Sequence, residues 1–193
     1  MTTKKRKVRF SRNNMTLKYS LLLHIILLSL SSLGQIQYDP TGSQFSHKQV
    51  KDFLTHHNIA RTEFKVPPLI WDASIATYAQ EWAEYLAKKK KCKLLHRDEL
   101  EKNPENYGEN LYWISSGDNF EPVRASLNWY EEKSIFEKNN YQFNHHLDMG
   151  HYTQMIWKNT THVGAGYAQC PSGAIIVVAN YNPPGNYIGE NPF

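Results

Sequence analysis

Helical and extended patterns occupy separate parts of this 193-residue chain, and their order is the strongest constraint on its fold. Apolar residues repeat at helical spacing within residues 46–91. The two segments richest in β-forming residues, 162–170 and 174–181, come last, and the turn sequence Pro171-Ser172-Gly173 joins them into a predicted hairpin. Parallel sheets need strands that alternate with helices. The order therefore predicts an α+β fold.

Two helices are predicted at the start of this region. Ser46 and Gln49 fit a capping box, and the apolar spacing that follows ends at the prolines 67–68. Asp72 is predicted to cap a second helix that ends in the lysines of 88–91, where positive charge favours the negative end of the helix dipole. We interpret this lysine run as a solvated helix end.

The middle of the chain is predicted to hold a strand and a third helix. Residues 109–114 favour the strand. Asn119 is predicted to cap the helix, with Pro122 tolerated in its first turn. Residues 95–107 and 138–150 are predicted to be loops.

Positive charge is concentrated at the N-terminus. Residues 1–34 contain seven lysines and arginines and no acidic residue, whereas the remainder has 15 basic and 18 acidic residues. A nucleic-acid-binding surface needs basic residues gathered on one face. We therefore expect no nucleic-acid partner for the body of the protein.

An apolar run at 21–30 follows the basic stretch and is shorter than the roughly 20 residues that a membrane span needs. Small residues at Ser32 and Gly34 occupy the positions that signal peptidase requires. We predict a secretory signal peptide at 1–34 and a secreted, extracellular protein. An uncleaved anchor is the alternative, and Met15 is an alternative start.

The length allows one domain, which we place at 46–193 after a short mobile lead-in at 35–45. Two features agree with the secretory route. Asn159 begins an Asn-Thr-Thr sequon for N-glycosylation, and Cys92 and Cys170 could pair in an oxidising compartment.

Four motifs occur in an order that resembles the CAP superfamily, which includes cysteine-rich secretory proteins, insect antigen 5 and plant pathogenesis-related proteins of the first class. The motifs are HNIAR at 57–61, GENL at 108–111, GHYTQMIWKNT at 150–160 and NYNPPGNY at 180–187. The resemblance covers residues 46–193. It implies a three-layer α–β–α sandwich around a small, mainly antiparallel sheet.

In this family two His and two Glu converge in a cleft and can hold a divalent metal ion. Motif by motif, the resemblance assigns these roles to His96, Glu109, Glu132 and His151. Glu131 is the competing residue, because the sequence leaves the register of that helix open. Imidazole and carboxylate groups suit Zn²⁺, and carboxylates also suit harder cations such as Mg²⁺. A divalent metal, Zn or Mg, is therefore the expected cofactor. The alternative is a hydrogen-bonded network that ties the helices to the sheet.

The cysteines depart from the plant pattern. Plant relatives have six cysteines, whereas this chain has only Cys92 and Cys170. The resemblance implies that these two form a disulfide. Ala165 and Ala179 occupy the positions where a second pair would sit, so that pair is absent as a whole.

The resemblance implies a secreted, non-enzymatic binding protein with a role in defence or in host and environment interaction. Relatives are reported to bind sterols or fatty acids, so a small lipid is an expected partner. Tyr112, Trp113 and Phe120 are candidates for the lip of a lipid groove, although aromatic residues at strand ends usually fill the core. A protein receptor is a further candidate partner, and we expect a monomer. The alternative function is a metal-dependent hydrolase or protease in which the same four residues activate water.

Overall fold

The structure is a computed structural model that describes residues 40–100, 103–115 and 120–193. The predicted signal peptide and the first part of the predicted lead-in lie outside these residues. The helices are α2 (His47–Thr62), α3 (Ala73–Lys90), α4 (Val123–Glu131), α5 (Lys133–Lys138), α6 (Gly150–Met155) and the 3₁₀ turn Asp98–Leu100. The strands are β1 (Ile70–Trp71), β2 (Gly108–Ile114), β3 (His162–Gln169) and β4 (Ile175–Asn182). Within the described part of the chain, no helix is both long and apolar enough to cross a bilayer.

The strands form one mixed sheet in the order β1-β3-β4-β2. The pairs β3–β4 and β4–β2 are antiparallel, and only the two-residue strand β1 pairs in parallel, with β3. The predicted hairpin is therefore confirmed. Ala165 and Ala179 lie directly opposite each other in this hairpin and are fully buried.

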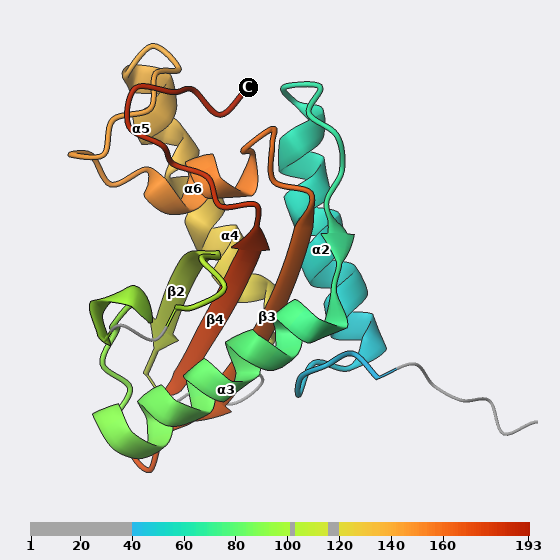
Figure 1. The fold of residues 1–193 in the computed structure, drawn as a ribbon, viewed down its shortest axis with the longest axis vertical. Helices are drawn as coiled ribbons and strands as arrows, with labels where there is room; N and C mark the ends of the chain where they lie inside the picture. The colour runs from blue at the N-terminus through green and yellow to red at the C-terminus, as the bar shows by residue number, and fades with distance from the viewer. Residues whose placement is uncertain (1–39, 101–102, 116–119) are drawn as a thin grey trace, which may run out of the picture. The chain divides into compact units, whose positions relative to one another are not determined.

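Helices cover both faces of the sheet. Helix α3 crosses one face, and α4 lies behind the other (Figure 1). One apolar cluster lies between α3 and the sheet, and a second joins the sheet to α2, α4 and α6. A Cβ added at Gly164 would lie 2.1 Å from the main-chain nitrogen of Ala76, so glycine is needed for α3 to approach β3 this closely. These layers confirm the three-layer α–β–α sandwich around a mainly antiparallel sheet.

The helix starts follow local signals, with one exception. Ser46 and Gln49 form the predicted capping box of α2, and Asp72 caps α3 by accepting from the main chain. The prediction that Asn119 caps the third helix, with Pro122 in its first turn, was wrong about the start. Helix α4 begins at Val123, with Pro122 at the cap position and no side-chain cap. Asn119 itself lies outside the described residues.

The last residues of the predicted lead-in pack against the domain. Phe45 is 2% exposed, and its ring lies 5.6 Å from that of Phe53 and 5.7 Å from that of Trp71. Thr41 accepts a hydrogen bond at its carbonyl from the indole of Trp71. The domain therefore begins before Ser46, and the described part of the lead-in belongs to it.

Candidate functional site

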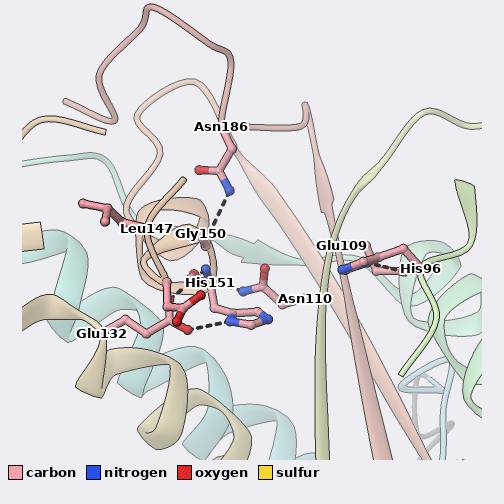
Figure 2. A pocket seen from close by; sticks show the side chains of 9 residues that line it. His96, Glu109, Asn110, Glu132, Leu147, Gly150, His151 and Asn186 are labelled. Atoms are coloured by element: carbon pink, nitrogen blue, oxygen red, sulfur yellow. Dashed lines mark hydrogen bonds and ion pairs between the residues drawn. The ribbon is translucent and has the colours of Figure 1, made fainter. Parts of the chain in front are cut away.

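A polar cavity of about 350 Å³ lies beside β2. All four residues that the resemblance singled out line it, and they come from different elements (Figure 2). His96 lies in the loop after α3, Glu109 on β2, Glu132 at the end of α4 and His151 in the first turn of α6. The remaining lining residues are Asn110, Leu147, Asp148, Gly150 and Asn186.

Glu132 and His151 form one His–Glu pair. Nδ1 of His151 lies 2.5 Å from Oε1 of Glu132. The other oxygen, Oε2, accepts hydrogen bonds from the main-chain nitrogens of His151 and Tyr152, each at 3.0 Å. The carboxylate therefore also caps the first turn of α6. Glu131 is exposed and does not line the cavity, which resolves the register that the sequence left open.

Glu109 and His96 form the second pair. Oε1 of Glu109 lies 3.0 Å from Nδ1 of His96 and accepts from the main-chain nitrogen of Arg97 at 3.0 Å. Oε2 accepts from the amide of Asn180 at 3.3 Å. This carboxylate raises the pKa of His96 above its usual value, although burial of the imidazole opposes the effect.

The two pairs reach the cavity from opposite faces of β2. Successive side chains of a strand point to opposite faces, so Glu109 and Asn110 diverge. Glu109 lies opposite Asn180 on β4, and Asn110 donates from Nδ2 to the carbonyl of His151 at 3.0 Å. Figure 2 shows β2 passing between the His151–Glu132 pair and the His96–Glu109 pair. The cavity therefore lies at the edge strand β2 and is lined by residues from both sides of the sheet.

The histidines are the accessible members of these pairs. The side chains of His96 and His151 are 44% and 37% exposed, whereas those of Glu109 and Glu132 are 6% and 18% exposed. Because each imidazole meets its glutamate through Nδ1, each keeps Nε2 for a ligand. Among the described residues no group of three or more His, Cys, Asp or Glu is placed to hold a metal ion. Imidazole nitrogen is a donor that suits a divalent metal, and the glutamates would then support the two histidines through Nδ1.

Asn110 and Asn186 are cavity residues that we did not predict as site residues. Asn186 has φ 61° and donates from Nδ2 to the carbonyl of Gly150 at 2.8 Å, while its Oδ1 accepts from Thr153 at 2.7 Å. Asn110 lies in the GENL motif and Asn186 in the NYNPPGNY motif. Their place in these motifs is the sequence signal that could have identified them as site residues. Asn186 also lines an adjoining cavity of about 230 Å³ that shares His96 and Glu109.

The lipid-groove candidates do not all face one side of the sheet. Tyr112 and Phe120 pack against the apolar cluster on the α2 and α4 face. Trp113 is 45% exposed, and strand alternation places it on the opposite face with Leu111, which packs in the cluster below α3. Lipid binding through these residues stays a prediction.

The disulfide and sequon candidates both lie in connections between helices and strands, the cysteines buried and the asparagine exposed. Cys92 and Cys170 form a disulfide with a Cα–Cα distance of 6.1 Å, which joins the end of α3 to the end of β3. Asn159 is exposed in the connection between α6 and β3. Its position allows modification, and glycosylation stays a prediction.

Comparison with known proteins gives one family. Residues 54–181 match the family described as "CAP: Cysteine-rich secretory protein family". The chain is 40% identical over 143 residues to pathogenesis-related protein 1C of Nicotiana tabacum, covering 74% of this chain and 80% of that protein. It is 36% identical over 180 residues to pathogenesis-related protein PR-1 of Medicago truncatula, covering 91% and 97%. Among solved structures, that of NaASP2 with Zn²⁺ has a TM-score of 0.59 at 22% identity, covering 77% of this chain and 86% of that chain, which supports the fold alone. With the sandwich fold and the cleft residues in place, these similarities show that the chain belongs to the CAP, or cysteine-rich secretory protein, family.

Proposed function

We propose that this chain is an exported, non-enzymatic binding protein of the pathogenesis-related type, whose cleft takes up a divalent metal ion through His96 and His151. One observation carries the proposal. Two His–Glu pairs line a single cavity, and each pair forms through Nδ1, at 3.0 Å for His96 and 2.5 Å for His151.

Histidines that bind a metal are typically paired with a carboxylate in this way. A histidine that binds a metal through one ring nitrogen usually donates from the other to a carboxylate, which fixes its tautomer and orientation. Neutral imidazole is a preferred ligand of Zn²⁺, so zinc is the first metal to test. A protein of the same fold, NaASP2, has been solved with Zn²⁺. A bound ion would supply a Lewis-acidic positive charge for an anionic or carbonyl group of a ligand.

The hydrogen bonds of the glutamates support binding rather than hydrolysis. Each carboxylate accepts from three N–H groups of the protein: Glu109 from His96, Arg97 and Asn180, and Glu132 from His151, twice, and Tyr152. A general base has to accept a proton from water or substrate within hydrogen-bond reach. Carboxylates already occupied in this way serve better as supports than as bases.

The proposal of export and of a role in defence rests on other features. The relatives are named pathogenesis-related proteins, and the family name includes the word secretory. A disulfide in this chain requires an oxidising compartment to persist. Intact mass of the protein secreted by a eukaryotic host is expected to lack residues 1–34, and a secreted chain that keeps them would contradict the predicted cleavage.

Zinc titration by calorimetry tests the cleft. We expect the wild type to bind zinc, and His96→Ala and His151→Ala each to weaken binding at least about tenfold, because each removes one ligand. His145→Ala is the matched control, since His145 is exposed and does not line the cavity. Affinity should fall as the pH is lowered, because protonated imidazole cannot bind metal, and the raised pKa of His96 makes this fall begin above the usual histidine pKa of about 6.5.

Melting curves of all variants control for folding. A wild type that takes up no zinc would refute the metal proposal. Loss of uptake in His145→Ala, with uptake kept in folded His151→Ala, would show that the metal site lies elsewhere.

A further inference from the structure

A chain of buried hydrogen bonds connects α2 with the main chain of His151. Nδ1 of His57 lies 2.9 Å from the carbonyl oxygen of Phe53, and Nε2 lies 2.9 Å from the hydroxyl of Tyr181. Nδ2 of Asn110 donates to that hydroxyl at 3.2 Å and to the carbonyl of His151 at 3.0 Å. His57 and Tyr181 are fully buried and Asn110 is 2% exposed. The chain thus runs from α2 through β4 and β2 to α6.

The partners determine the direction of every bond in this chain. The carbonyl of Phe53 can only accept, so His57 carries its proton on Nδ1. Burial lowers the pKa of His57 to about 3, so the imidazole is neutral at physiological pH and its Nε2 is an acceptor. Tyr181 therefore donates to His57, and the same oxygen accepts from Asn110. Both N–H groups of the Asn110 amide are used, one toward Tyr181 and one toward His151.

The main chain of His151 is held at both of its polar groups. Its N–H donates to Oε2 of Glu132 at 3.0 Å, and its carbonyl accepts from Asn110 at 3.0 Å. The imidazole is stacked on the indole of Trp129, with ring centroids 6.0 Å apart and an interplanar angle of 15°. That indole is itself fixed by a hydrogen bond to the carbonyl of Leu111 at 3.1 Å.

We propose that Asn110, held in place by Tyr181 and His57, is a positioning residue for His151. It fixes the main chain at the start of α6, so that the imidazole pairs with Glu132 through Nδ1 and presents Nε2 to the cavity. The consequence for metal affinity rests on the proposed function, whereas the orientation of His151 does not require a metal. Outer-shell partners of metal ligands typically change affinity 10–100-fold when removed.

Tyr181→Phe is the principal test, because it removes one hydroxyl and keeps the aromatic ring in the core. Tyr181 does not line the cavity, and the hydrogen bond of its hydroxyl with Asn110 connects it to His151. We expect zinc affinity to fall at least about tenfold and the imidazole NMR signals of His151 in the metal-free protein to shift. The signals of His96 are expected to stay in place, since its pair with Glu109 lies on the other face of β2.

Tyr130→Phe is the matched control. It removes a tyrosine hydroxyl that bonds to Glu63 and takes no part in the series of hydrogen bonds from His57 to His151. We expect it to change neither the zinc affinity nor the His151 signals. If Tyr181→Phe does not fold, Asn110→Ala keeps the Tyr181–His57 bond and removes both hydrogen bonds of the Asn110 amide, to Tyr181 and to His151. Its expected result is the same loss of zinc affinity.

Two outcomes separate this inference from the proposed function. Folded Tyr181→Phe with wild-type zinc affinity and unchanged His151 signals would overturn the positioning role and leave the metal site intact. A wild type without zinc uptake would overturn the proposed function, while a shift of the His151 signals in Tyr181→Phe would still support the positioning role.

Discussion

Arg61 offers the sharpest prediction about stability. It is fully buried, and its guanidinium donates to four main-chain carbonyls. Nε bonds to Pro67 at 2.6 Å, Nη1 to Met155 at 3.0 Å and to Trp157 at 2.9 Å, and Nη2 to Thr160 at 2.9 Å. Among the ion pairs of the described residues, none involves this side chain. Burial lowers its pKa to about 10, so it is still charged at pH 7.

Arg61→Met is expected to destabilise the fold by about 4 kcal/mol. Methionine fills part of the same space with an apolar side chain but leaves four carbonyls without their hydrogen-bond donor. A buried polar group without a hydrogen bond costs about 1–3 kcal/mol. We use about 1 kcal/mol for each carbonyl, because loss of the cation also removes its own desolvation cost. Arg61→Lys keeps the charge, but a compact ammonium cannot span all four carbonyls. It should lose about half as much, about 2 kcal/mol.

Urea unfolding followed by tryptophan fluorescence measures both losses, since the chain has five tryptophans. Arg124→Met is the control, because Arg124 is exposed on α4 and a surface change of this kind is usually worth less than about 0.5 kcal/mol. A loss below about 1 kcal/mol in Arg61→Met would refute the reasoning, since it would mean that the carbonyls find other donors.

Three further predictions concern acid stability, the disulfide and modification. Burial lowers the pKa of His57 to about 3, so the unfolded chain binds a proton below pH 6.5 that the folded chain does not. This residue should therefore lower the free energy of unfolding by about 2.5 kcal/mol between pH 7 and about pH 4.5. Urea titrations of His57→Leu should not show this part of the loss. Cys92→Ala should lower the melting temperature, because the bridge to Cys170 spans 78 residues and is worth about 4 kcal/mol in the chain-entropy model. Free thiols in non-reducing peptide maps would contradict this. Asn159→Gln and Thr161→Ala should each remove one N-glycan from protein secreted by a eukaryotic host, and masses equal to wild type would reject the sequon.

Helix starts and strands could be predicted where the signal is local. The capping box of α2 and the Asp72 cap of α3 are made by residues within three positions of each other, so the sequence contains the whole interaction. The start of α4 was placed wrongly because asparagine is favoured in turns as well as at caps. The helix starts after Pro122 and has no side-chain cap. A prediction that relied on a capping side chain therefore could not find its start.

Two short elements, one of which carries a site residue, were not predicted from the sequence. Strand β1 has two residues and α6 has six, too few for a hydrophobic period to emerge. Helix α6 owes its position to Glu132, a residue 18 positions before Gly150, whose carboxylate accepts from the first turn. The packing of Phe45 against Phe53 and Trp71 is likewise a tertiary contact that extended the domain into the predicted lead-in.

The sequence by itself determined the family, the α+β layers, the hairpin and three of the four cleft residues, His96, Glu109 and His151, because these depend on motifs and on spacing along the chain. Only the tertiary structure decided how those residues are used. It placed Glu132 and not Glu131 in the cavity, and it turned both carboxylates into acceptors for main-chain and side-chain N–H groups. It also linked His57 to His151 through Tyr181 and Asn110. The physical reason is that a hydrogen bond depends on donor and acceptor meeting at about 3 Å, and residues from separate helices and strands meet only when both layers have packed on the sheet.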